Sequence, residues 1–269
     1  MLLTRALSAI VLAPLVIGVA VIGGWALAGF LIVALGIAAW EYTRLMRQGG
    51  YRPAWWVAMM LAAAFTVDAV PIDAARPSAG LLAPALGLTL MASLTWHMRT
   101  RTPTVTADWA LGVAGGMYLG WAGRQFVEIR ALDAEGAWLL LTLIGTWLAD
   151  SSAYLVGVRL GRHKLATSLS PKKSWEGLAG GIVFAVAGNA LAAAALGRPP
   201  IHGAALGLIG GAFGTLGDLS ISMIKRQVGA KDSGGLIPGH GGALDRLDSL
   251  LFAVVAANLY LRWIAGLPA

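Results

Sequence analysis

The sequence predicts an all-α, polytopic bundle of transmembrane helices. Of its 269 residues, 58% are hydrophobic and only 12% are charged, and the mean hydropathy is +0.73. Soluble domains are typically about 45–50% apolar and about 25% charged, so this chain has more apolar surface than a soluble core can bury. The apolar stretches are continuous rather than alternating, which favours helices over a β-barrel because a helix pairs all of its own backbone groups in hydrocarbon.

About nine apolar runs approach the roughly 20 residues that a helix needs to cross a bilayer. They lie at about residues 7–23, 25–43, 54–70, 80–96, 109–127, 137–157, 178–196, 203–223 and 248–265. The first two follow each other without a polar spacer and predict a helical hairpin. Residues 1–24 also resemble a signal peptide, but we interpret them as an uncleaved first span.

The two halves of the chain differ in polarity. Residues 1–135 hold about five spans with little intramembrane charge, and we interpret them as an N-terminal scaffold in which Gly112, Gly116 and Gly120 permit close helix approach. Residues 136–269 hold about four spans and two polar loops, 159–177 and 224–247, both expected in the cytoplasm. Glu41 lies near a span end, where we expect it to be solvated and Glu41→Gln to be nearly silent.

Positive charge predicts the orientation. Most of the 20 Lys and Arg residues fall in segments that would share one side, namely at residues 5, 44–52, 99–101, 159–173 and 225–246. Cytoplasmic loops are enriched in Lys and Arg, so the N-terminus is predicted to be cytoplasmic and the C-terminus outside. The net charge of +7 is attributed to this topology and to anionic lipid, and no nucleic-acid partner is expected.

Two features of the composition narrow the chemistry further. The 11 Trp residues, among them Trp55, Trp138 and Trp263, are interpreted as interfacial anchors rather than as platforms for stacking bases. The absence of cysteine excludes disulfides, thiolate metal sites and cysteine nucleophiles.

Ionisable residues concentrate in the second half, within or at the edge of apolar runs. Such residues are costly in a membrane and are functional candidates by default. Asp245 and Asp248 are three apart and would share a helix face, while Asp218, Ser222 and Lys225 are spaced to form another. Oxygen ligands of this kind suit Mg²⁺, although ion pairs at a helix start are the alternative interpretation.

A glycine-rich turn separates these two faces. His240 lies in it and could be a general base, a ligand, a phosphate donor or a structural residue, of which phosphate contact is favoured. The backbone of such a loop can approach an anion closely.

The other polar loop suggests a second anion-binding element. Ser170 or Ser174 is expected to cap the helix of the seventh span, with Pro171 in its first turn. Lys172 and Lys173 beside free helix N–H groups would form a phosphate cradle, unless they only set topology. Glu176 is assigned equally to capping or to metal binding, and His163 is expected to be exposed.

One motif resembles a known family. The run Ser222-x-Ile224-Lys225-Arg226-x4-Lys231-Asp232-x-Gly234-x2-Ile237-Pro238-x-His240-Gly241-Gly242-x2-Asp245-Arg246-x-Asp248 resembles the signature of the phosphatidate cytidylyltransferases, also called CDP-diacylglycerol synthases. Segments 150–157 and 170–177 are similar to other parts of that family, so the likeness covers about residues 140–250. Ser152, where many members would carry glycine, is the one departure noted.

The resemblance implies a membrane nucleotidyltransferase in phospholipid biosynthesis that joins CTP and phosphatidic acid to give CDP-diacylglycerol and pyrophosphate. It implies Mg²⁺, alone or with a second cation, a homodimer, and a multi-pass location in the plasma (bacterial inner) membrane with a cytoplasmic active site in residues 136–269. The implied roles are metal binding by Asp218, Asp245 and Asp248, catalysis by these three with Lys225 and Lys231, and substrate binding by Asp150, Ser170, Lys172, Lys173, Ser222, Arg226, Asp232, His240 and Arg246.

Elementary phosphate chemistry is compatible with this assignment. A phosphate monoester has a second pKa near 6 and is already a nucleophilic anion at neutral pH. Such a reaction needs aligned cations more than a general base, and no Ser-His-Asp arrangement can be discerned. The alternative is a transporter of phosphorylated metabolites, although no convincing internal repeat is found.

Overall fold

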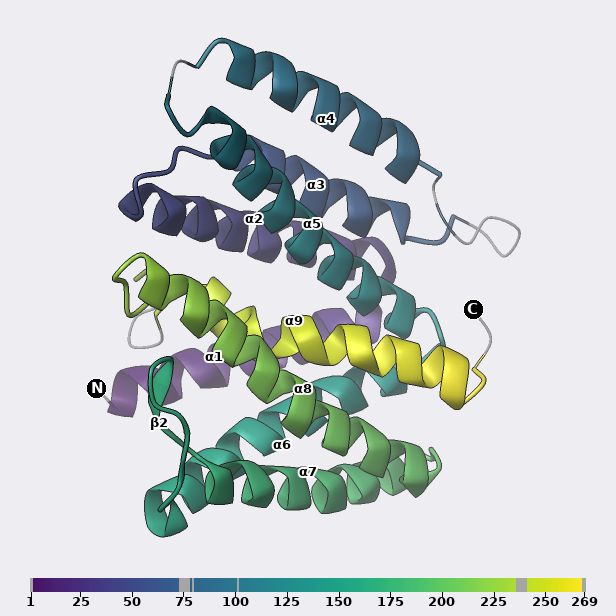
Figure 1. Ribbon diagram of the computed structural model, residues 1–269. Coiled ribbons are helices and arrows are strands. Elements are labelled where there is room, and N and C mark those ends of the chain that lie inside the picture. Colours follow the sequence, from purple (N-terminus) through teal and green to yellow (C-terminus); the bar gives the residue numbers. More distant parts are fainter. Residues whose placement is uncertain (1, 73–77, 79, 101, 236–240, 268–269) are drawn as a thin grey trace. The chain divides into compact units, whose positions relative to one another are not determined.

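The computed structural model describes residues 2–72, 78, 80–100, 102–235 and 241–267 (Figure 1). Within this part of the chain it contains nine α-helices, and each coincides with one predicted apolar run. They are α1 (Leu2–Ile22), α2 (Gly24–Gln48), α3 (Trp55–Asp68), α4 (Leu82–Met98), α5 (Val105–Arg130), α6 (Ala137–Leu160), α7 (Trp175–Ala195), α8 (Pro200–Gln227) and α9 (Leu244–Leu259). A short π-helix, Tyr260–Ile264, extends α9. The all-α prediction is confirmed.

Five of the described helices are long and apolar enough to cross a membrane. They are α2, α6, α7, α8 and α9 together with its π-helical extension. Residues 12–22 of α1 and all of α3 form shorter apolar helices. A multi-pass membrane protein is therefore supported, whereas the number of nine spans and the cytoplasmic N-terminus stay predictions.

The chain divides into two compact units. The first comprises Met1–Ala131 and Lys225–Arg246, and the second comprises Leu132–Ile224 and Leu247–Ala269. Most of the signature segment is thus grouped with the N-terminal helices, in which the sequence alone identified no function. The division into regions 1–135 and 136–269 stays a prediction.

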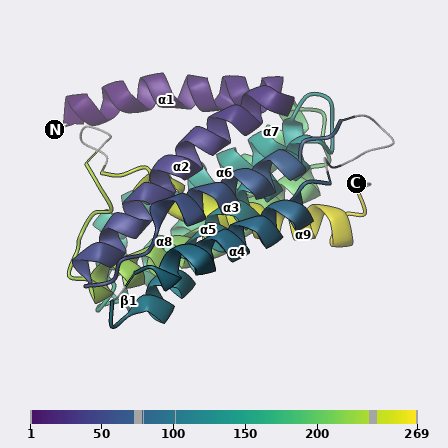
Figure 2. The ribbon, with the colours of Figure 1, turned by 90° about the horizontal axis from the view of Figure 1, so that it is seen from above.

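In the first unit, α3 lies between α2 and α4, and α5 packs along α3 (Figures 1 and 2). Glycines on α5 make this packing close: a Cβ at Gly116 would lie 2.8 Å from the Ala58 Cα, and one at Gly120 would lie 2.9 Å from the Leu61 carbonyl oxygen. The close packing expected from the sequence is confirmed at Gly116 and Gly120, whereas a Cβ at Gly112 would come no nearer than 3.7 Å to a neighbour.

A buried carboxylate also fixes a loop in this unit. Asp68, at the end of α3, accepts hydrogen bonds from the backbone N–H groups of Leu81 (2.7 Å) and Leu82 (3.0 Å) and is paired with Arg124 at 2.6 Å. It therefore joins the end of α3 to the start of α4 and to α5.

In the second unit, α8 uses glycines to approach its neighbours. A Cβ at Gly207 would overlap the Ala185 backbone of α7, and one at Gly210 would lie 2.7 Å from the Gly145 carbonyl carbon of α6. Asn189 of α7 is fully buried and donates its amide to the Gly203 carbonyl of α8 at 2.9 Å. Small residues and one polar side chain join these helices, as is common within membranes.

A two-stranded hairpin connects α6 to α7 where the sequence predicted only a loop. Strand β1 (Lys164–Ala166) pairs antiparallel with β2 (Ser170–Ser174), and Ala166 lies opposite Ser170. Ser174 caps α7, because its Oγ accepts the Gly177 N–H at 3.1 Å. Ser170 and Pro171 lie in β2, so Ser170 is the wrong one of the two capping candidates, and the expectation that Pro171 lies in the first turn of the helix is also wrong.

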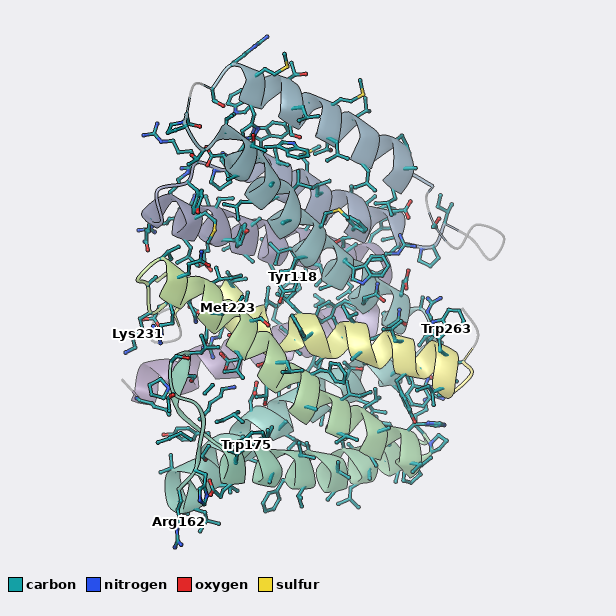
Figure 3. All side chains as sticks on the ribbon, viewed as in Figure 1. Tyr118, Arg162, Trp175, Met223, Lys231 and Trp263 are labelled. Atoms are coloured by element: carbon teal, nitrogen blue, oxygen red, sulfur yellow. The ribbon has the colours of Figure 1, made fainter. Side chains whose placement is uncertain are left out.

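One tryptophan does not fit the interfacial interpretation. Trp138 is 4% exposed, with the Arg198 guanidinium 5.7 Å from its ring centroid and the His202 ring beside it. By contrast, Trp263, which is labelled in Figure 3, is 81% exposed. Trp138 is thus a packing residue of the second unit.

Candidate active site

The signature segment joins the end of α8 to the start of α9. It leaves α8 after Gln227 and enters α9 at Leu244, and the structure describes its residues up to 235 and from 241. His240, predicted to contact phosphate, lies outside the described residues, so its role stays a prediction. Val228 packs against the end of α2, since a Cβ at Gly49 would lie 2.7 Å from its Cγ1.

The part of the signature segment that belongs to the first unit contains a buried ion pair. The Lys225 ammonium donates to Asp245 Oδ1 at 2.6 Å, and the two residues are 7% and 8% exposed. A buried charge is costly unless it is paired and hydrogen-bonded. The structure therefore brings together two of the predicted catalytic residues, one from the end of α8 and one from the start of α9.

The second oxygen of Asp245 is held by the loop itself. Oδ2 accepts the Ser233 N–H at 2.8 Å, the Ser233 hydroxyl at 2.9 Å and the Gly242 N–H at 3.1 Å. These donors come from the beginning and the end of the glycine-rich turn. They fix the orientation of the Asp245 carboxylate. Ser233 was not among the site residues predicted from the sequence.

Glu41 of α2 also reaches this loop. It is 0% exposed, and its Oε2 accepts the Leu244 N–H at 2.9 Å and the Ser233 hydroxyl at 3.1 Å. The expectation that Glu41 is solvated is wrong, because the signature loop covers it. Glu41 and Ser233 are 192 residues apart, and no local pattern around Glu41 indicates this contact.

Asp218 is the corresponding carboxylate in the second unit. Its Oδ2 is paired with the Lys173 ammonium at 2.6 Å, and its Oδ1 accepts the Ser222 hydroxyl at 3.2 Å. The predicted face of α8 is therefore present. Lys173, expected in a phosphate cradle, is brought to a candidate metal carboxylate by strand β2.

Asp248 lies next to this part of α8. It is 8% exposed, and its backbone carbonyl is so close to Gly217 that a Cβ there would overlap it. Asp218 and Asp248 are thus carried by two helices in close contact within one unit. Asp245 belongs to the other unit, so its sharing of a metal with Asp218 stays a prediction.

The remaining predicted catalytic and substrate-binding residues differ in exposure. Ser170 is half-buried in β2. The exposed residues of this set are Asp150, Lys172, Arg226, Lys231, Asp232 and Arg246. Arg226 donates to the Ala230 carbonyl at 2.9 Å, and Lys231 points away from the ribbon (Figure 3). Exposure leaves the cationic side chains accessible to a phosphate that arrives from water.

Glu176 stabilises the turn before the hairpin. Its carboxylate accepts the backbone N–H groups of Arg162 (3.1 Å) and His163 (3.2 Å) and contacts the His163 ring at 2.5 Å. The carboxylate thus joins the start of α7 to the residues that follow α6. This role differs from both helix capping and metal binding, the two roles expected from the sequence. The His163 side chain is 80% exposed, as predicted.

The oxygen atoms of Asp218 and Ser222 are suitable ligands for a hard divalent cation. In the described part of the chain no group of three or more His, Cys, Asp or Glu side chains converges. Mg²⁺ is usually held by one or two carboxylates, with waters and substrate phosphates completing its shell. The Asp218 carboxylate and the Ser222 hydroxyl are oxygen ligands of that type. Magnesium binding stays a prediction.

Taken together, the fold and the site define a helical membrane protein with a cation-rich, carboxylate-containing segment at helix ends. Comparison with known proteins places it more narrowly. A family model described as "Cytidylyltransferase family" matches residues 3–264. The chain belongs to this family, which confirms the resemblance noted in the signature.

Individual relatives agree with the family match. A phosphatidate cytidylyltransferase of Synechocystis sp. is 32% identical over 92% of this chain and 92% of its own length. Relatives with the same name from Bacillus subtilis and Mycobacterium tuberculosis are each 43% identical, over 51% and 46% of this chain. In these two alignments the chain spans about half or less of the relative, 52% and 38%.

Proposed function

We propose that the chain transfers the cytidylyl group of CTP to the phosphate of phosphatidic acid, forming CDP-diacylglycerol and releasing pyrophosphate. The observation that carries this proposal is the family match over residues 3–264, together with the Synechocystis relative that aligns over 92% of the chain. The buried ion pair of Lys225 and Asp245 within the signature supports it. Ionisable residues buried among membrane helices are costly, so they are candidates for a functional role.

The chemistry follows from the charges of the substrates. An oxygen of the lipid phosphate forms a bond to the α-phosphorus of CTP, while the bond from that phosphorus to the bridging oxygen breaks and its electrons leave with pyrophosphate. The attacking group is already an anion near neutral pH, so no side chain has to remove a proton. The protein's task is to hold two mutually repelling anions in line.

The cationic side chains are suited to that task. We assign Lys172, Arg226 and Lys231, which are exposed, to the phosphates of the entering nucleotide, together with His240. Lys225 and Lys173 hold the carboxylates Asp245 and Asp218 in place. Mg²⁺ bound by Asp218, Asp245 and Asp248 would neutralise charge on the departing pyrophosphate.

The site is assigned to the cytoplasmic face of a plasma membrane, where CTP from water and a lipid headgroup can meet, and the enzyme is assigned as a homodimer. The concentration of Lys and Arg in segments 159–173 and 225–246 supports this orientation.

The decisive experiment supplies purified protein with radiolabelled CTP, phosphatidic acid and Mg²⁺. We expect lipid-soluble label and pyrophosphate in equal amounts, and neither without phosphatidic acid. Reconstituted vesicles that accumulate a phosphorylated metabolite while releasing no pyrophosphate would instead support a transporter.

A further inference from the structure

Glu41 is a buried carboxylate outside the signature that nevertheless contacts it. It lies in α2, is 0% exposed, and receives hydrogen bonds from Ser233 and Leu244. Its other oxygen, Oε1, is buried without a hydrogen-bond partner among the described residues. Burying a carboxylate costs free energy unless it is hydrogen-bonded. In the described part of the chain, the hydrogen-bond donors to Glu41 both belong to the signature segment.

The contact with Leu244 occurs at a helix terminus. The Leu244 N–H is the first of α9, and the first N–H groups of a helix have no partner within it. A carboxylate at this end is also favoured by the helix dipole. Glu41 therefore caps, from a distant helix, the element that carries Asp245 and Asp248.

The contact with Ser233 extends to Asp245. The Ser233 hydroxyl lies 3.1 Å from Glu41 Oε2 and 2.9 Å from Asp245 Oδ2. One hydroxyl donates one hydrogen, so the two carboxylates share a single donor. A change at Glu41 is thereby transmitted to the orientation of Asp245.

Two glycines of the signature leave space for this arrangement. A Cβ at Gly234 would overlap Glu41 Oε1, and a Cβ at Gly242 would overlap Glu41 Oε2 and the Ser233 hydroxyl. Neither glycine has a positive φ, so the close approach to Glu41, not backbone conformation, restricts these positions. Glu41 thus gives a physical reason for glycine in the motif.

We propose that Glu41 is a positioning residue, which fixes Ser233 and the first turn of α9 so that the Asp245 carboxylate keeps the orientation needed for cytidylyl transfer. The catalytic part of this inference rests on the proposed function, whereas the structural part does not. Asp68 offers a matched comparison, because it is also buried and also accepts the first N–H of a helix, but it holds Leu81 and Leu82 at the start of α4 instead.

The first test measures the loop directly by electron paramagnetic resonance. The chain has no cysteine, and a Cβ at Gly235 meets nothing within 4 Å, so Gly235→Cys can carry a nitroxide label. We expect a restricted spectrum in the otherwise wild-type protein, a more mobile one with Glu41→Ala, and no change with Asp68→Asn. Glu41→Gln should restore most of the restriction, because its amide oxygen can accept both hydrogen bonds.

The second test measures turnover of the unlabelled variants. We expect Glu41→Ala to lower kcat by about tenfold or more with little change in the KM for CTP, because it removes a charge-assisted hydrogen bond to the helix that carries the site. Glu41→Gln should stay near wild type, for the reason just given rather than because the residue is solvated. Asp68→Asn should keep its kcat.

The two tests separate the possible failures. An unchanged spectrum and unchanged kcat in Glu41→Ala would overturn the positioning role. If Glu41→Ala loosens the loop but the wild-type protein itself forms no CDP-lipid, the positioning role stands and the proposed reaction is overturned. If Glu41→Ala does not fold, Gly234→Ala disturbs the same contact from the loop side and should lower kcat, with Gly87→Ala, which meets nothing within 4 Å, as its control. Equal kcat in these two variants would also overturn the positioning role.

Discussion

The two central carboxylates differ in how deeply their lysine partners are buried. Lys225 and Asp245 have side chains 9% and 7% exposed, whereas those of Lys173 and Asp218 are 24% and 27% exposed. Removing one member of a buried pair leaves an uncompensated charge and typically costs about 3–5 kcal/mol. The same change at a partly solvated pair costs much less. A substitution at Asp245 should therefore affect stability as well as turnover, whereas one at Asp218 should affect mainly turnover.

We predict that Asp218→Asn and Asp245→Asn both abolish Mg²⁺-dependent turnover. Asp218→Asn should leave the melting temperature in detergent nearly unchanged, while Asp245→Asn should lower it because Lys225 stays buried without its carboxylate. Turnover and thermal unfolding measured on the same preparations check this. Glu135→Gln, whose side chain is 73% exposed, is the control and should change neither. Wild-type turnover in either aspartate variant would refute the metal assignment.

Contacts between individual site residues could be predicted from the sequence only where the residues are close along the chain. Asp218 and Ser222 are four apart on one helix, so their contact followed from helical geometry. The contact of Glu41 with Ser233 joins residues 192 apart, which no periodicity can indicate. For the same reason Ser233, which is not part of the motif, could not be assigned.

Among the elements, the β1–β2 hairpin differs from expectation. A Pro and two Lys residues before a helix favoured a capped first turn, but the segment pairs with residues 164–166 instead and α7 begins only after Ser174. Pro171 is tolerated because a two-stranded hairpin consists of edge strands, in which a missing N–H need not break a ladder. The apolar runs themselves predicted all nine described helices, since burial in lipid demands continuous apolar sequence.

The hairpin separates the two lysines that the sequence treated alike. Lys172 is exposed, whereas Lys173 is paired with Asp218. We predict that Lys172→Ala raises the KM for CTP several-fold with little change in kcat, while Lys173→Ala also lowers kcat because Asp218 loses its partner. Steady-state kinetics over a range of CTP concentrations measures both. An unchanged KM in Lys172→Ala would reassign that residue to membrane topology.

Helix α8 offers a prediction about packing. A Cβ at Gly210 would lie 2.7 Å from both the Gly145 carbonyl carbon and the Thr146 nitrogen, and backbone atoms cannot yield as a flexible side chain can. Overpacking typically costs about 1–3 kcal/mol. Gly210→Ala should therefore lower the melting temperature in detergent, whereas Gly87→Ala, in open space on α4, should leave it unchanged or raise it slightly. Equal melting temperatures would contradict the close packing of α6 and α8.

For the molecule as a whole, the signature segment spans both units. Lys225 to Arg246 are grouped with the N-terminal helices, while Asp218 and Asp248 belong to the other unit. The first half, which its apolar composition predicted to be a scaffold, therefore supplies Glu41 to the predicted site. Composition could predict that these helices enter the membrane, but it could not show which of them would hold the loop.

The orientation of the whole chain can be tested at the two ends of α6. This helix has 24 residues, which at 1.5 Å each gives about 36 Å, enough to cross the hydrocarbon core. Glu135 precedes it, Arg162 follows it, and both are exposed. The excess of Lys and Arg in segment 159–173 predicts that the Arg162 end is cytoplasmic.

The cysteine-free chain allows Glu135→Cys and Arg162→Cys to be labelled singly with a membrane-impermeant maleimide. In intact cells we expect only Glu135→Cys to react, and in inverted vesicles only Arg162→Cys. The reverse pattern would place the proposed active site on the face that CTP does not reach.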